Sequence, residues 1–376
     1  MNISHKKLHI VSFDVPYPPD YGGVVDVFYK IKTLAELGID IYLHTFEYGR
    51  KQQKILKKYC KKVFYYKRNS FTRSFLSAAP FIVKSRANAE LVANLNTHHF
   101  PILFEGLHTT CPVYENKLTT QQIFVRAHNI EHRFYRGLSE SESNIFKKKF
   151  FRRESKKLKK YQNILKNVKG VFTISPFEQE YFHKKIGNHS TYIPAFHDVQ
   201  RKKYTTEKGV HILYHGNVLV SENVKAALFL IDTYKNSKFK LVIASSYTNE
   251  KLLHEIRKFP NISFSKINTE KDLSILLDNA HVNALPTFQK TGIKLKLLNT
   301  LYRGKFIIAN TFMVEDTGLE GLCELANTKE EFLAKTKKLF TLNFTSAVIG
   351  ERMQLLEKWN PINGARKIID IIFEQP

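Results

Sequence analysis

One stretch of the sequence decides the fold: Thr291-Gly-Ile-Lys-Leu-Lys-Leu-Leu-Asn299, followed by Leu-Tyr-Arg-Gly304 and Lys-Phe-Ile-Ile308. It predicts a loop opened by glycine, a helix and a buried strand, in that order. Lys294 and Lys296 fall in the first turns of the predicted helix. The start of a helix attracts anions because its first backbone N–H groups are unpaired and the helix dipole is positive there. Two lysines at that position therefore predict a site for a diphosphate.

A second glycine feature, Pro18-Pro-Asp-Tyr-Gly22-Gly23, precedes the first predicted helix of the chain. Apolar residues recur at helical spacing from Val24 to Ala35, and Gly38 is placed to end this helix. The chain thus has one glycine opening in each half. This arrangement predicts a cleft that grips a phosphorylated ligand from both sides.

The composition indicates a globular protein with two domains. The 376 residues exceed what one typical core holds, and 43% are apolar and 25% charged. Three cysteines, Cys60, Cys111 and Cys323, have no metal-binding spacing, which fits a reducing compartment. No apolar run reaches the roughly 18 residues that span a bilayer, and Leu8–Phe13 is too short for a secretory signal. We therefore expect a cytoplasmic protein.

Short strand-like runs alternate with helical periods in both halves, which predicts parallel sheets covered by helices on both faces. We therefore expect an α/β fold with two Rossmann-like domains and a polar linker within His197–Gly209. The predicted strands are Leu8–Phe13, Ile39–His44, Val63–Tyr66, Ile102–Glu105, Ile123–Ala127, Val171–Ile174, His211–Tyr214, Leu241–Ala244, Ile262–Phe264, Val282–Leu285 and Phe306–Ala309. The helices predicted in the second half are Asn223–Tyr234, Thr248–Phe259, Glu270–Leu277 and Lys294–Tyr302.

The net charge of +25 predicts an anionic partner, but it does not choose among nucleic acid, lipid and phosphorylated substrates. Basic residues gather in 146–169, where apolar residues interrupt the run at helical spacing. This pattern predicts a long basic amphipathic helix, and such helices bind anionic membranes, with about 1 kcal/mol for each basic residue. The alternative is a solvated helix whose apolar stripe packs on the first domain. Membrane binding and packing on the first domain are compatible if one face of the helix packs and the other contacts lipid.

Several motifs, in their order and spacing, resemble the GT-B glycosyltransferases and within them glycosyltransferase family 4. Pro16–Gly23 resembles the family's N-terminal glycine loop, and Arg126-Ala-His-Asn-Ile-Glu131 is similar to its strand-ending histidine motif. His215–Asn223 resembles the loop that opens the C-terminal domain, and Gly292–Lys305 resembles the donor-binding signature. Trp359 lies in a segment similar to the tail that crosses back to the first domain. The resemblance covers nearly the whole chain.

The resemblance implies an acceptor-binding domain at 1–200, a nucleotide-sugar-binding domain at 205–355 and a returning helical segment at 356–376. It implies transfer from a nucleoside-diphosphate sugar with retention of anomeric configuration, and without a metal ion or other cofactor. One departure is Asn299, because the family usually has a glutamate there that accepts hydrogen bonds from the donor ribose. Asparagine accepts without charge, and charged hydrogen bonds are roughly twice as strong. A further family glutamate corresponds to Thr291.

The predicted diphosphate site combines Lys294 and Lys296 with backbone N–H groups of Thr291 and Gly292, which together would stabilise the leaving group. Helix lysines are usually solvated, but the flanking glycines favour function here. Asn223 is equally suited to cap the helix that follows it. The remaining predicted substrate contacts are Tyr21, Gly22 and Gly23 in the first loop, Gly216, Asn217 and Asn223 in the second half, Tyr247 and Ile267 beside the base and ribose, and Asn299.

His108 and His128 each follow a predicted strand of the first half and are candidate catalytic residues. In the family, a histidine at such a strand end touches the donor sugar or the acceptor. A histidine that caps a loop fits the sequence equally well, and the sequence does not say which histidine is nearer to the reaction. Glu105 and Glu131 are candidates for binding acceptor hydroxyls, with a surface or capping role as the alternative.

The sequence therefore predicts a hexosyltransferase-like enzyme on the inner face of the cell membrane. Its acceptor would be a glycan or a lipid-linked glycan in bacterial surface polysaccharide assembly. A basic nucleic-acid-binding protein is the rival hypothesis, although the chain has no helix-turn-helix or zinc signature. A nucleotide-sugar-binding protein that has lost catalysis is a third hypothesis, which Asn299 motivates.

Overall fold

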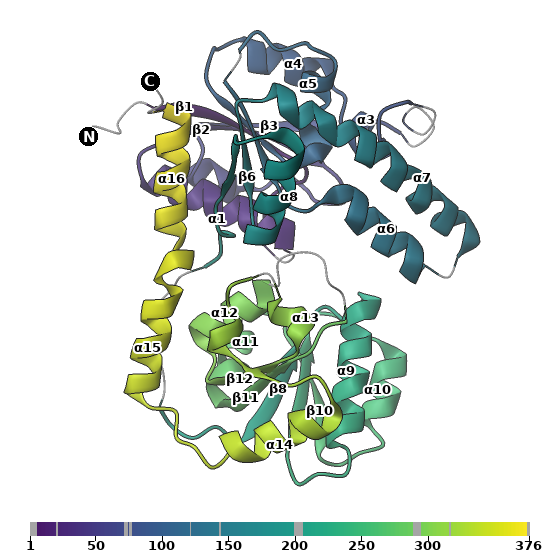
Figure 1. The fold of residues 1–376 in the computed structure, drawn as a ribbon, viewed down its shortest axis with the longest axis vertical. Coiled ribbons are helices and arrows are strands. Elements are labelled where there is room, and N and C mark those ends of the chain that lie inside the picture. Colours follow the sequence, from purple (N-terminus) through teal and green to yellow (C-terminus); the bar gives the residue numbers. More distant parts are fainter. Residues whose placement is uncertain are drawn as a thin grey trace. The chain divides into compact units, whose positions relative to one another are not determined.

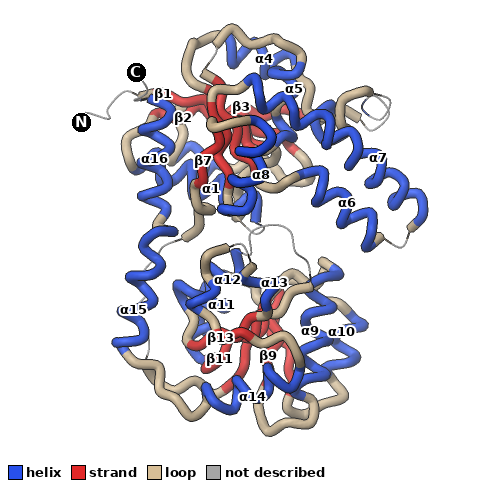
Figure 2. Tube along the Cα trace, viewed as in Figure 1, coloured by secondary structure: helices blue, strands red, loops and turns tan. Residues whose placement is uncertain are grey.

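The computed structural model describes residues 6–19, 22–70, 74, 77–120, 122–142, 144–198, 206–288, 295–315 and 317–373. The chain forms two compact units. Unit 1 comprises the chain up to His197 together with the segment from Trp359 onward, and unit 2 comprises most of the chain between them. Each unit contains one parallel sheet flanked by helices (Figures 1 and 2). The predicted α/β fold with two Rossmann-like sheets is confirmed.

The sheet of unit 1 has seven parallel strands in the order β3-β2-β1-β4-β5-β6-β7. Its inner strands are almost continuously buried because helices cover both faces. The strands are β1 (Lys7–Ser12), β2 (Asp40–Glu47), β3 (Lys62–Lys67), β4 (Ile102–Glu105), β5 (Ile123–Ala127), β6 (Gly170–Thr173) and β7 (Ser190–Tyr192). The last strand, β7, has no apolar run and is absent from the sequence prediction.

Two sets of helices cover the sheet of unit 1. The first and the last helix of the chain, α1 and α16, lie side by side on one face, where Val27 and Ile31 share a core with Ile368 and Ile369 (Figure 1). Helices α3, α4, α7 and α8 bury their apolar residues in the other core. The helices are α1 (Gly22–Glu36), α3 (Phe81–Lys84), α4 (Ala89–Asn96), α5 (Cys111–Tyr114), α6 (Glu131–Ser141), α7 (Ile145–Tyr161), α8 (Pro176–Ile186) and α16 (Pro361–Phe373), with 3₁₀ turns η1 (Lys54–Lys58), η2 (Leu107–Thr109) and η3 (Gln162–Asn167).

The end of α1 follows the prediction. Gly38 adopts a φ of 90°, a left-handed conformation that glycine takes without a steric penalty. Its N–H donates to the carbonyl of Ala35 at 3.0 Å, and the N–H of Ile39 donates to Leu34 at 3.1 Å. These bonds satisfy carbonyls that the helix end would otherwise leave unpaired.

The prediction of one helix over 146–169 is wrong in its second part. The α-helix α7 ends at Tyr161, and the tighter 3₁₀ turn η3 follows it. This tighter turn brings Gln162, Ile164 and Leu165 together on the buried side. Gln162 also exchanges hydrogen bonds with the Tyr181 hydroxyl at 2.8 and 3.0 Å. The end of the basic segment therefore belongs to the core of unit 1.

The sheet of unit 2 has six parallel strands in the order β10-β9-β8-β11-β12-β13. Helices α9 and α14 pack together through Phe229 and Phe332, whose rings lie 5.4 Å apart. The strands are β8 (His211–His215), β9 (Leu241–Ser245), β10 (Ile262–Lys266), β11 (Ala280–Leu285), β12 (Phe306–Ala309) and β13 (Glu324–Leu325). The helices are α9 (Ser221–Tyr234), α10 (Glu250–Ile256), α11 (Glu270–Asn279), α12 (Leu295–Arg303), α13 (Thr311–Val314), α14 (Lys329–Leu339) and α15 (Ser346–Leu356), with 3₁₀ turns η4 (Glu320–Leu322) and η5 (Glu357–Trp359). Among the described residues, no helix has the length and apolarity to cross a bilayer.

The packing of α16 on unit 1 yields a stability prediction. Ile368 is fully buried, and Ile368→Ala should destabilise the unit by about 2–5 kcal/mol through lost burial and a cavity. The matched control is Ile362→Ala in the same helix, where 42% of the residue is exposed and a change within about 0.5 kcal/mol is expected. Urea unfolding followed by circular dichroism measures both. Equal effects of the two substitutions would show that α16 does not belong to this core.

Candidate active site

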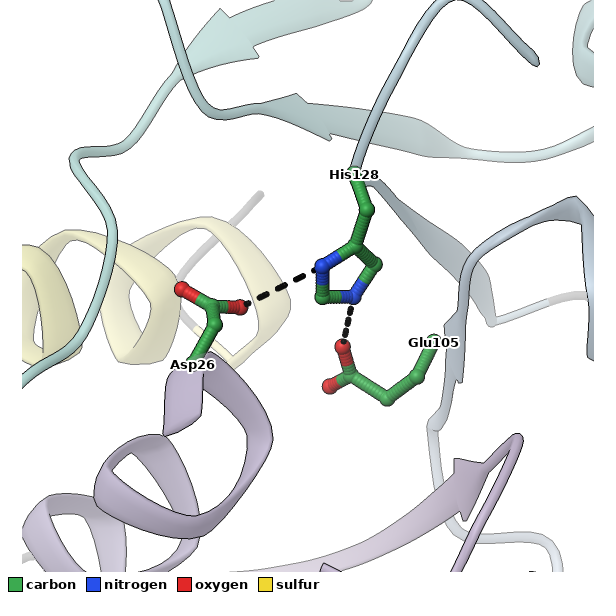
Figure 3. Close-up of side chains that lie close together, drawn as sticks. All are labelled: Asp26, Glu105 and His128. Atoms are coloured by element: carbon green, nitrogen blue, oxygen red, sulfur yellow. Dashed lines mark hydrogen bonds and ion pairs between the residues drawn. The ribbon is translucent and has the colours of Figure 1, made fainter. Parts of the chain in front are cut away.

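A buried cluster of charged side chains lies at the carboxyl ends of β4 and β5. Glu105 ends β4, His128 directly follows β5, and Asp26 lies in the second turn of α1. The Nε2 atom of His128 is 2.9 Å from Oε2 of Glu105, and its Nδ1 atom is 3.9 Å from Oδ2 of Asp26 (Figure 3). Both nitrogens of His128 thus face buried carboxylates, which hold the ring in one orientation.

Two buried cations neutralise this cluster. The ammonium of Lys30 donates to Oδ2 of Asp26 at 2.8 Å and to Oε2 of Glu105 at 3.0 Å. The guanidinium of Arg126 donates to both carboxylate oxygens of Asp26, at 2.9 and 3.2 Å. Burial by itself raises the pKa of Asp26, but Arg126 and Lys30 outweigh burial and hold this pKa well below its usual range. Asp26 is therefore ionised throughout the physiological range.

The same cluster has the donor types of a metal site, since one ligand atom each from Asp26, Glu105 and His128 lie within 4.8 Å of one another. The neighbouring cations argue against a metal ion here. Lys30 already donates to both carboxylates, so a divalent ion would sit beside a buried ammonium and repel it. The residues do not fit a metal ion, and the cluster serves to position His128.

Arg126 also ties together the chain segments that follow the neighbouring strands. Its Nη1 donates to the carbonyls of Thr173 and Ile193 at 3.1 and 2.7 Å, and its Nη2 donates to Pro194 at 3.0 Å. The backbone N–H of Phe196 donates to Asp26 at 2.8 Å. The sequence prediction missed Asp26, Lys30 and Arg126 as parts of the site. The available signal was a pair of opposite charges four residues apart on the apolar face of the first helix.

The second histidine, His108, lies in η2 directly after β4 and has different surroundings. Its Nδ1 atom is buried and lies 4.0 Å from Oε1 of Glu131, the first residue of α6. Within the described part of the chain, neither atom has a hydrogen-bond partner. The His108 side chain as a whole keeps 21% of its surface exposed. The Nδ1 edge of the ring is therefore buried next to Glu131, and the side chain as a whole is only partly exposed.

The ring of Phe13 brings the two histidines together. Its centre lies 5.4 Å from that of His108 and 5.5 Å from that of His128. A Cβ atom on Gly23 would lie 2.7 Å from Cζ of Phe13, so only glycine fits under this ring. Arg86 donates from Nε to the Phe13 carbonyl at 2.9 Å and supports the loop from below. The structure thus gathers Gly23, His108 and His128 around one aromatic side chain.

Two buried carboxyl groups, Glu131 beside His108 and Glu178 near Glu131, hold their protons unusually strongly. Burial, together with the nearby carboxyl of Glu178, raises the pKa of Glu131 to about 8. Burial also raises the pKa of Glu178 to about 8. Burial lowers the pKa of His108 well below its ordinary value, and the positive charge of Arg86 is the second-largest cause. At pH 7 all three groups are therefore mainly uncharged, and Glu131 titrates just above neutrality.

In unit 2, four of the predicted residues come together after β8. Lys296 on α12 donates from Nζ to Oδ1 of Asn223 at 3.1 Å, and its ammonium lies 5.0 Å from the centre of the Tyr214 ring. Asn223 donates to the carbonyl of Asn217 at 3.0 Å, and a Cβ atom on Gly216 would meet Asn223 at 3.2 Å. The capping alternative for Asn223 is wrong, because α9 already begins at Ser221. Its side chain instead positions Lys296 and the loop after β8.

Ser245, at the end of β9, ties three loops of unit 2 together. Its hydroxyl accepts from the N–H of Val218 at 3.3 Å and of Tyr247 at 3.2 Å. Its carbonyl accepts from the N–H of Ile267 at 2.9 Å. The loops after β8, β9 and β10 therefore share one buried residue, and they include the predicted contacts Tyr247 and Ile267. Glu222, which the sequence prediction passed over, similarly accepts from the N–H of Phe288 after β11.

For the other predicted site residues, the structure gives only their exposure or does not describe them. Gly22 is exposed at the start of α1, and Asn299 is half-buried on α12. Tyr21, Thr291, Gly292 and Lys294 lie outside the described residues. Of the residues predicted to form the diphosphate site, the structure thus describes only Lys296.

Comparison with known proteins identifies the class of fold. No family model matches the sequence. An uncharacterized 44.6 kDa protein in the cps region of Klebsiella pneumoniae is 25% identical over 346 residues, which cover 87% of this chain and 88% of that protein. Sucrose-phosphate synthase from Thermosynechococcus elongatus superposes with a TM-score of 0.71 at 13% identity, over 98% of this chain and 99% of that chain.

Two further solved structures agree with this class. The lipopolysaccharide outer core galactosyltransferase WaaB in its apo form gives a TM-score of 0.64 at 15% identity, over 98% of this chain and 99% of that one. HepE from Anabaena, solved with UDP and glucose, gives 0.66 at 11% identity, over 99% of this chain and 100% of that one. The protein is thus built from two Rossmann-like units. Its fold is the GT-B fold of glycosyltransferases, which confirms the resemblance at the level of architecture.

The buried cluster yields a prediction that separates Lys30 from ordinary lysines. Lys30→Met leaves Asp26 and Glu105 with less compensation and should destabilise unit 1 by about 3–5 kcal/mol. Lys32→Met on the same helix is the control, since it loses only a cation–π contact with Tyr29 worth about 0.5–1 kcal/mol. Thermal and urea unfolding measure both variants.

A rescue variant sharpens this experiment. Adding Glu105→Gln to Lys30→Met removes one of the two buried charges that lost their partner, so the double variant should recover part of the lost stability. A double variant that is no more stable than Lys30→Met alone would contradict the proposed charge balance.

Proposed function

We propose that this protein is a retaining glycosyltransferase that moves a hexose-type sugar from a nucleoside-diphosphate sugar to a glycan or lipid-linked glycan. The observation that carries the proposal is the ammonium of Lys296, held by Asn223 and stacked on Tyr214 beside the loop after β8. This position is the carboxyl edge of a parallel sheet, where ligands of such folds bind. The GT-B fold and the similar structure of HepE, solved with UDP and glucose, support a nucleotide-sugar donor.

The chemistry at Lys296 suits a leaving diphosphate. Negative charge builds on the diphosphate as the bond to the anomeric carbon breaks, and a preorganised cation stabilises that charge. The charge of Lys296 contributes, after burial, to lowering the pKa of the adjacent His215 to about 3. His215 therefore stays neutral and adds no competing charge. In this proposal Lys294, Thr291 and Gly292 extend the diphosphate site, Asn299 meets the ribose, and no metal ion is needed.

The proposed acceptor is a growing surface polysaccharide, bound on unit 1 near His108. The acceptor contacts predicted for Glu105 and Glu131 do not hold, because both side chains are buried. The relative from the cps region of Klebsiella pneumoniae supports a role in polysaccharide assembly. The relative WaaB, a galactosyltransferase of the lipopolysaccharide outer core, supports a glycan acceptor. Retention of configuration rests on the resemblance to family 4 and is tested by the anomeric proton signal of the product in NMR.

Binding of nucleotides tests the donor site. UDP, GDP, ADP, dTDP and CMP are compared by thermal shift, and a ligand at 100 times its dissociation constant stabilises by about 2.7 kcal/mol. We expect one nucleotide to stand out, and Lys296→Met to weaken it by roughly 10- to 100-fold through loss of about 1.5–3 kcal/mol of charged hydrogen bonding. The control Lys251→Met changes an exposed lysine on α10 and should bind normally. Absence of any shift would contradict the proposal, and binding without sugar transfer would indicate a degenerate binding protein.

A second part of the proposal concerns the membrane. Helices α6 and α7 lie side by side and extend away from the rest of unit 1 (Figure 1). Leu158 and Tyr161 in the second half of α7 are buried in the core. At its start, 55% of Ile145 and 80% of Phe146 are exposed, and three exposed lysines, Lys147 to Lys149, follow directly. An apolar tip next to basic residues matches the chemistry of an anionic lipid surface.

The tip is a defined structure, which makes it a target for substitution. Asn144 caps α7 by accepting from the N–H groups of Phe146 and Lys147 at 3.0 and 3.1 Å. Ser139 of α6 donates to the carbonyl of Lys148 at 3.1 Å and joins the two helices. The contact with lipid is therefore proposed for the start of α7 and not for the whole segment 146–169.

Vesicle binding tests this surface. The double variant Ile145→Ser with Phe146→Ser should bind vesicles of phosphatidylglycerol and phosphatidylcholine at least about tenfold more weakly, because a buried large apolar side chain contributes about 1.5–3 kcal/mol. Ile362→Ser, an exposed position on α16, is the control. Equal binding of all variants would contradict a role for the tip. Tighter binding of the protein to random duplex DNA than to vesicles at physiological salt would favour the nucleic-acid hypothesis.

A further inference from the structure

We propose that Arg68, with Arg50 and Arg86 beside it, forms a binding site on unit 1 for an anionic group of the acceptor. The group would be a carboxylate or a phosphate of an acidic glycan, so the enzyme would extend acidic acceptors in preference to neutral ones. The inference rests on the proposed glycosyltransferase function and deepens it by naming the class of acceptor. The residues and contacts that carry it all lie within unit 1.

The three arginines gather at the carboxyl edge of the unit 1 sheet. Arg50 lies in the loop after β2, Arg68 directly follows β3, and Arg86 lies in the turn after α3. Arg86 donates from Nε to the carbonyl of Phe13 at 2.9 Å, and Nε of Arg50 lies 3.6 Å from Oδ2 of Asp14. Two of the arginines are therefore anchored to the residues that follow β1. Ligands of open parallel sheets bind at this edge.

Hydrogen bonds hold Arg68 close to Arg86. The N–H of Asn69 donates to the carbonyl of Ser85 at 2.7 Å, and the Asn69 side chain donates to the carbonyl of Ala87 at 2.8 Å. Nη2 of Arg68 donates to Oγ of Ser85 at 2.9 Å. The end of β3 is thus fastened to the turn that carries Arg86.

The surroundings of Arg68 balance its charge poorly. Its guanidinium lies 4.0 Å from the centre of the Tyr48 ring, and among the described residues its stacking and hydrogen-bond partners, Tyr48 and Ser85, are uncharged at neutral pH. Asp14 acts on Arg68 electrostatically but forms an ion pair with Arg50. Burial is the largest influence on the pKa of Arg68 and lowers it, so the cation is partly desolvated. An anionic ligand would offset the free energy that this desolvation costs.

The neighbouring titratable groups leave the site positive at neutral pH. Burial, followed by the charges of Arg86, His128 and Arg68, lowers the pKa of His108 well below its ordinary value, so His108 is neutral. Glu131 beside His108 is mainly protonated at pH 7, because burial raises its pKa to about 8. Glu131 therefore does not offset the charge of the arginines.

Arginine is the side chain that best matches a carboxylate or a phosphate. Its planar guanidinium carries five N–H donors in a fixed fork, which binds two oxygens of either anion at once. Ser85 accepts from one end of the Arg68 fork and fixes its direction. The Tyr48 ring, of which 64% of the residue is exposed, supports the guanidinium near the surface. Arg68 therefore has both the charge and the orientation to bind an oxyanion.

Binding of model sugars tests the site without turnover. Nitrogen-15 NMR of arginine-labelled protein reports the Nε–H group of each arginine, and Arg68 is assigned by the signal that is lost in Arg68→Gln. Methyl glucuronide, glucose 6-phosphate, neutral methyl glucoside and inorganic phosphate are titrated at physiological salt. We expect at least one anionic sugar to shift the Arg68 signal and to bind at least about tenfold more tightly than methyl glucoside, which lacks charged hydrogen bonds.

The two anionic sugars distinguish the sources of the charge. A preference for methyl glucuronide would assign an acidic sugar of the glycan, and a preference for glucose 6-phosphate would assign a phosphate attached to it. An Arg68 signal that shifts with neither sugar would overturn the site. Inorganic phosphate that binds as tightly as both sugars would also overturn it, because the site would then recognise a free ion and not an acidic glycan.

Substitution of Arg68 tests whether this side chain provides the binding. Arg68→Gln should weaken the anionic sugar roughly 10- to 100-fold, and Arg68→Lys should weaken it less, because lysine keeps the charge and loses the fork. The matched control is Arg133→Gln on α6, since Arg133 also stacks on a tyrosine, 4.8 Å from the centre of the Tyr181 ring. The control should bind as the wild type. Equal weakening by both glutamine variants would show a general effect of charge and overturn the assignment.

Sugar transfer with the donor found by the nucleotide panel tests the assignment to the acceptor. In Arg68→Gln, KM for an acceptor with the preferred anionic group should rise roughly 10- to 100-fold with little change in kcat, because the contact binds ground state and transition state alike. Nucleotide affinity should stay at the wild-type value. A loss of nucleotide affinity in this variant would overturn the inference, since the arginines would then bind the donor.

The outcomes separate this inference from the function on which it rests. Equal transfer to acidic and neutral acceptors, in the wild type and in Arg68→Gln, would overturn the arginine site and leave the transferase intact. Anionic sugars that shift the Arg68 signal while no nucleotide binds would contradict the transferase and support the site as one for an acidic glycan.

Discussion

The ion-paired cluster of Asp26, Lys30 and Arg126 is the constraint on which unit 1 depends. It ties the first helix to the ends of the central strands and to the chain after β6 and β7, because Arg126 donates to the carbonyls of Thr173, Ile193 and Pro194 and the N–H of Phe196 donates to Asp26. A buried ion pair is costly to desolvate and holds only if every charge finds a partner. Here the partners come from segments far apart in the sequence, so the cluster forms only when the whole sheet edge has formed. The carboxylates of Asp26 and Glu105 in turn hold the His128 ring in one orientation.

The two histidines lie at the same sheet edge but have different electrostatic surroundings. His128 lies between carboxylates that are tied to cations, whereas His108 faces a carboxyl group that burial keeps protonated near neutral pH. Both rings touch Phe13, so they share one location and differ in what lies behind them. The environment, rather than the residue type, thus sets the two rings apart.

At the carboxyl edge of its sheet, unit 2 is held by hydrogen bonds rather than by a buried ion-pair cluster. Its loops are held by hydrogen bonds in which Ser245 and Glu222 accept from backbone N–H groups and Asn223 donates to a carbonyl. Lys296 lies at that edge and donates to the side chains of Tyr214 and Asn223. Lys30 differs, because its charge is balanced by two buried carboxylates.

The sequence by itself determined the alternation of strands and helices, because apolar periodicity reports burial locally, and it marked the glycine loops and Lys296. It overran α7 and omitted β7 and β13, since the 3₁₀ turn at Gln162 and the pairing of Ser190–Tyr192 and Glu324–Leu325 depend on contacts with distant residues. The tertiary structure alone decided the partners of Asp26, Glu105 and Glu131, and with them the difference between His108 and His128. The reason is physical: pKa values and ion pairs depend on distances of a few ångströms between side chains that lie about 20 to 100 residues apart.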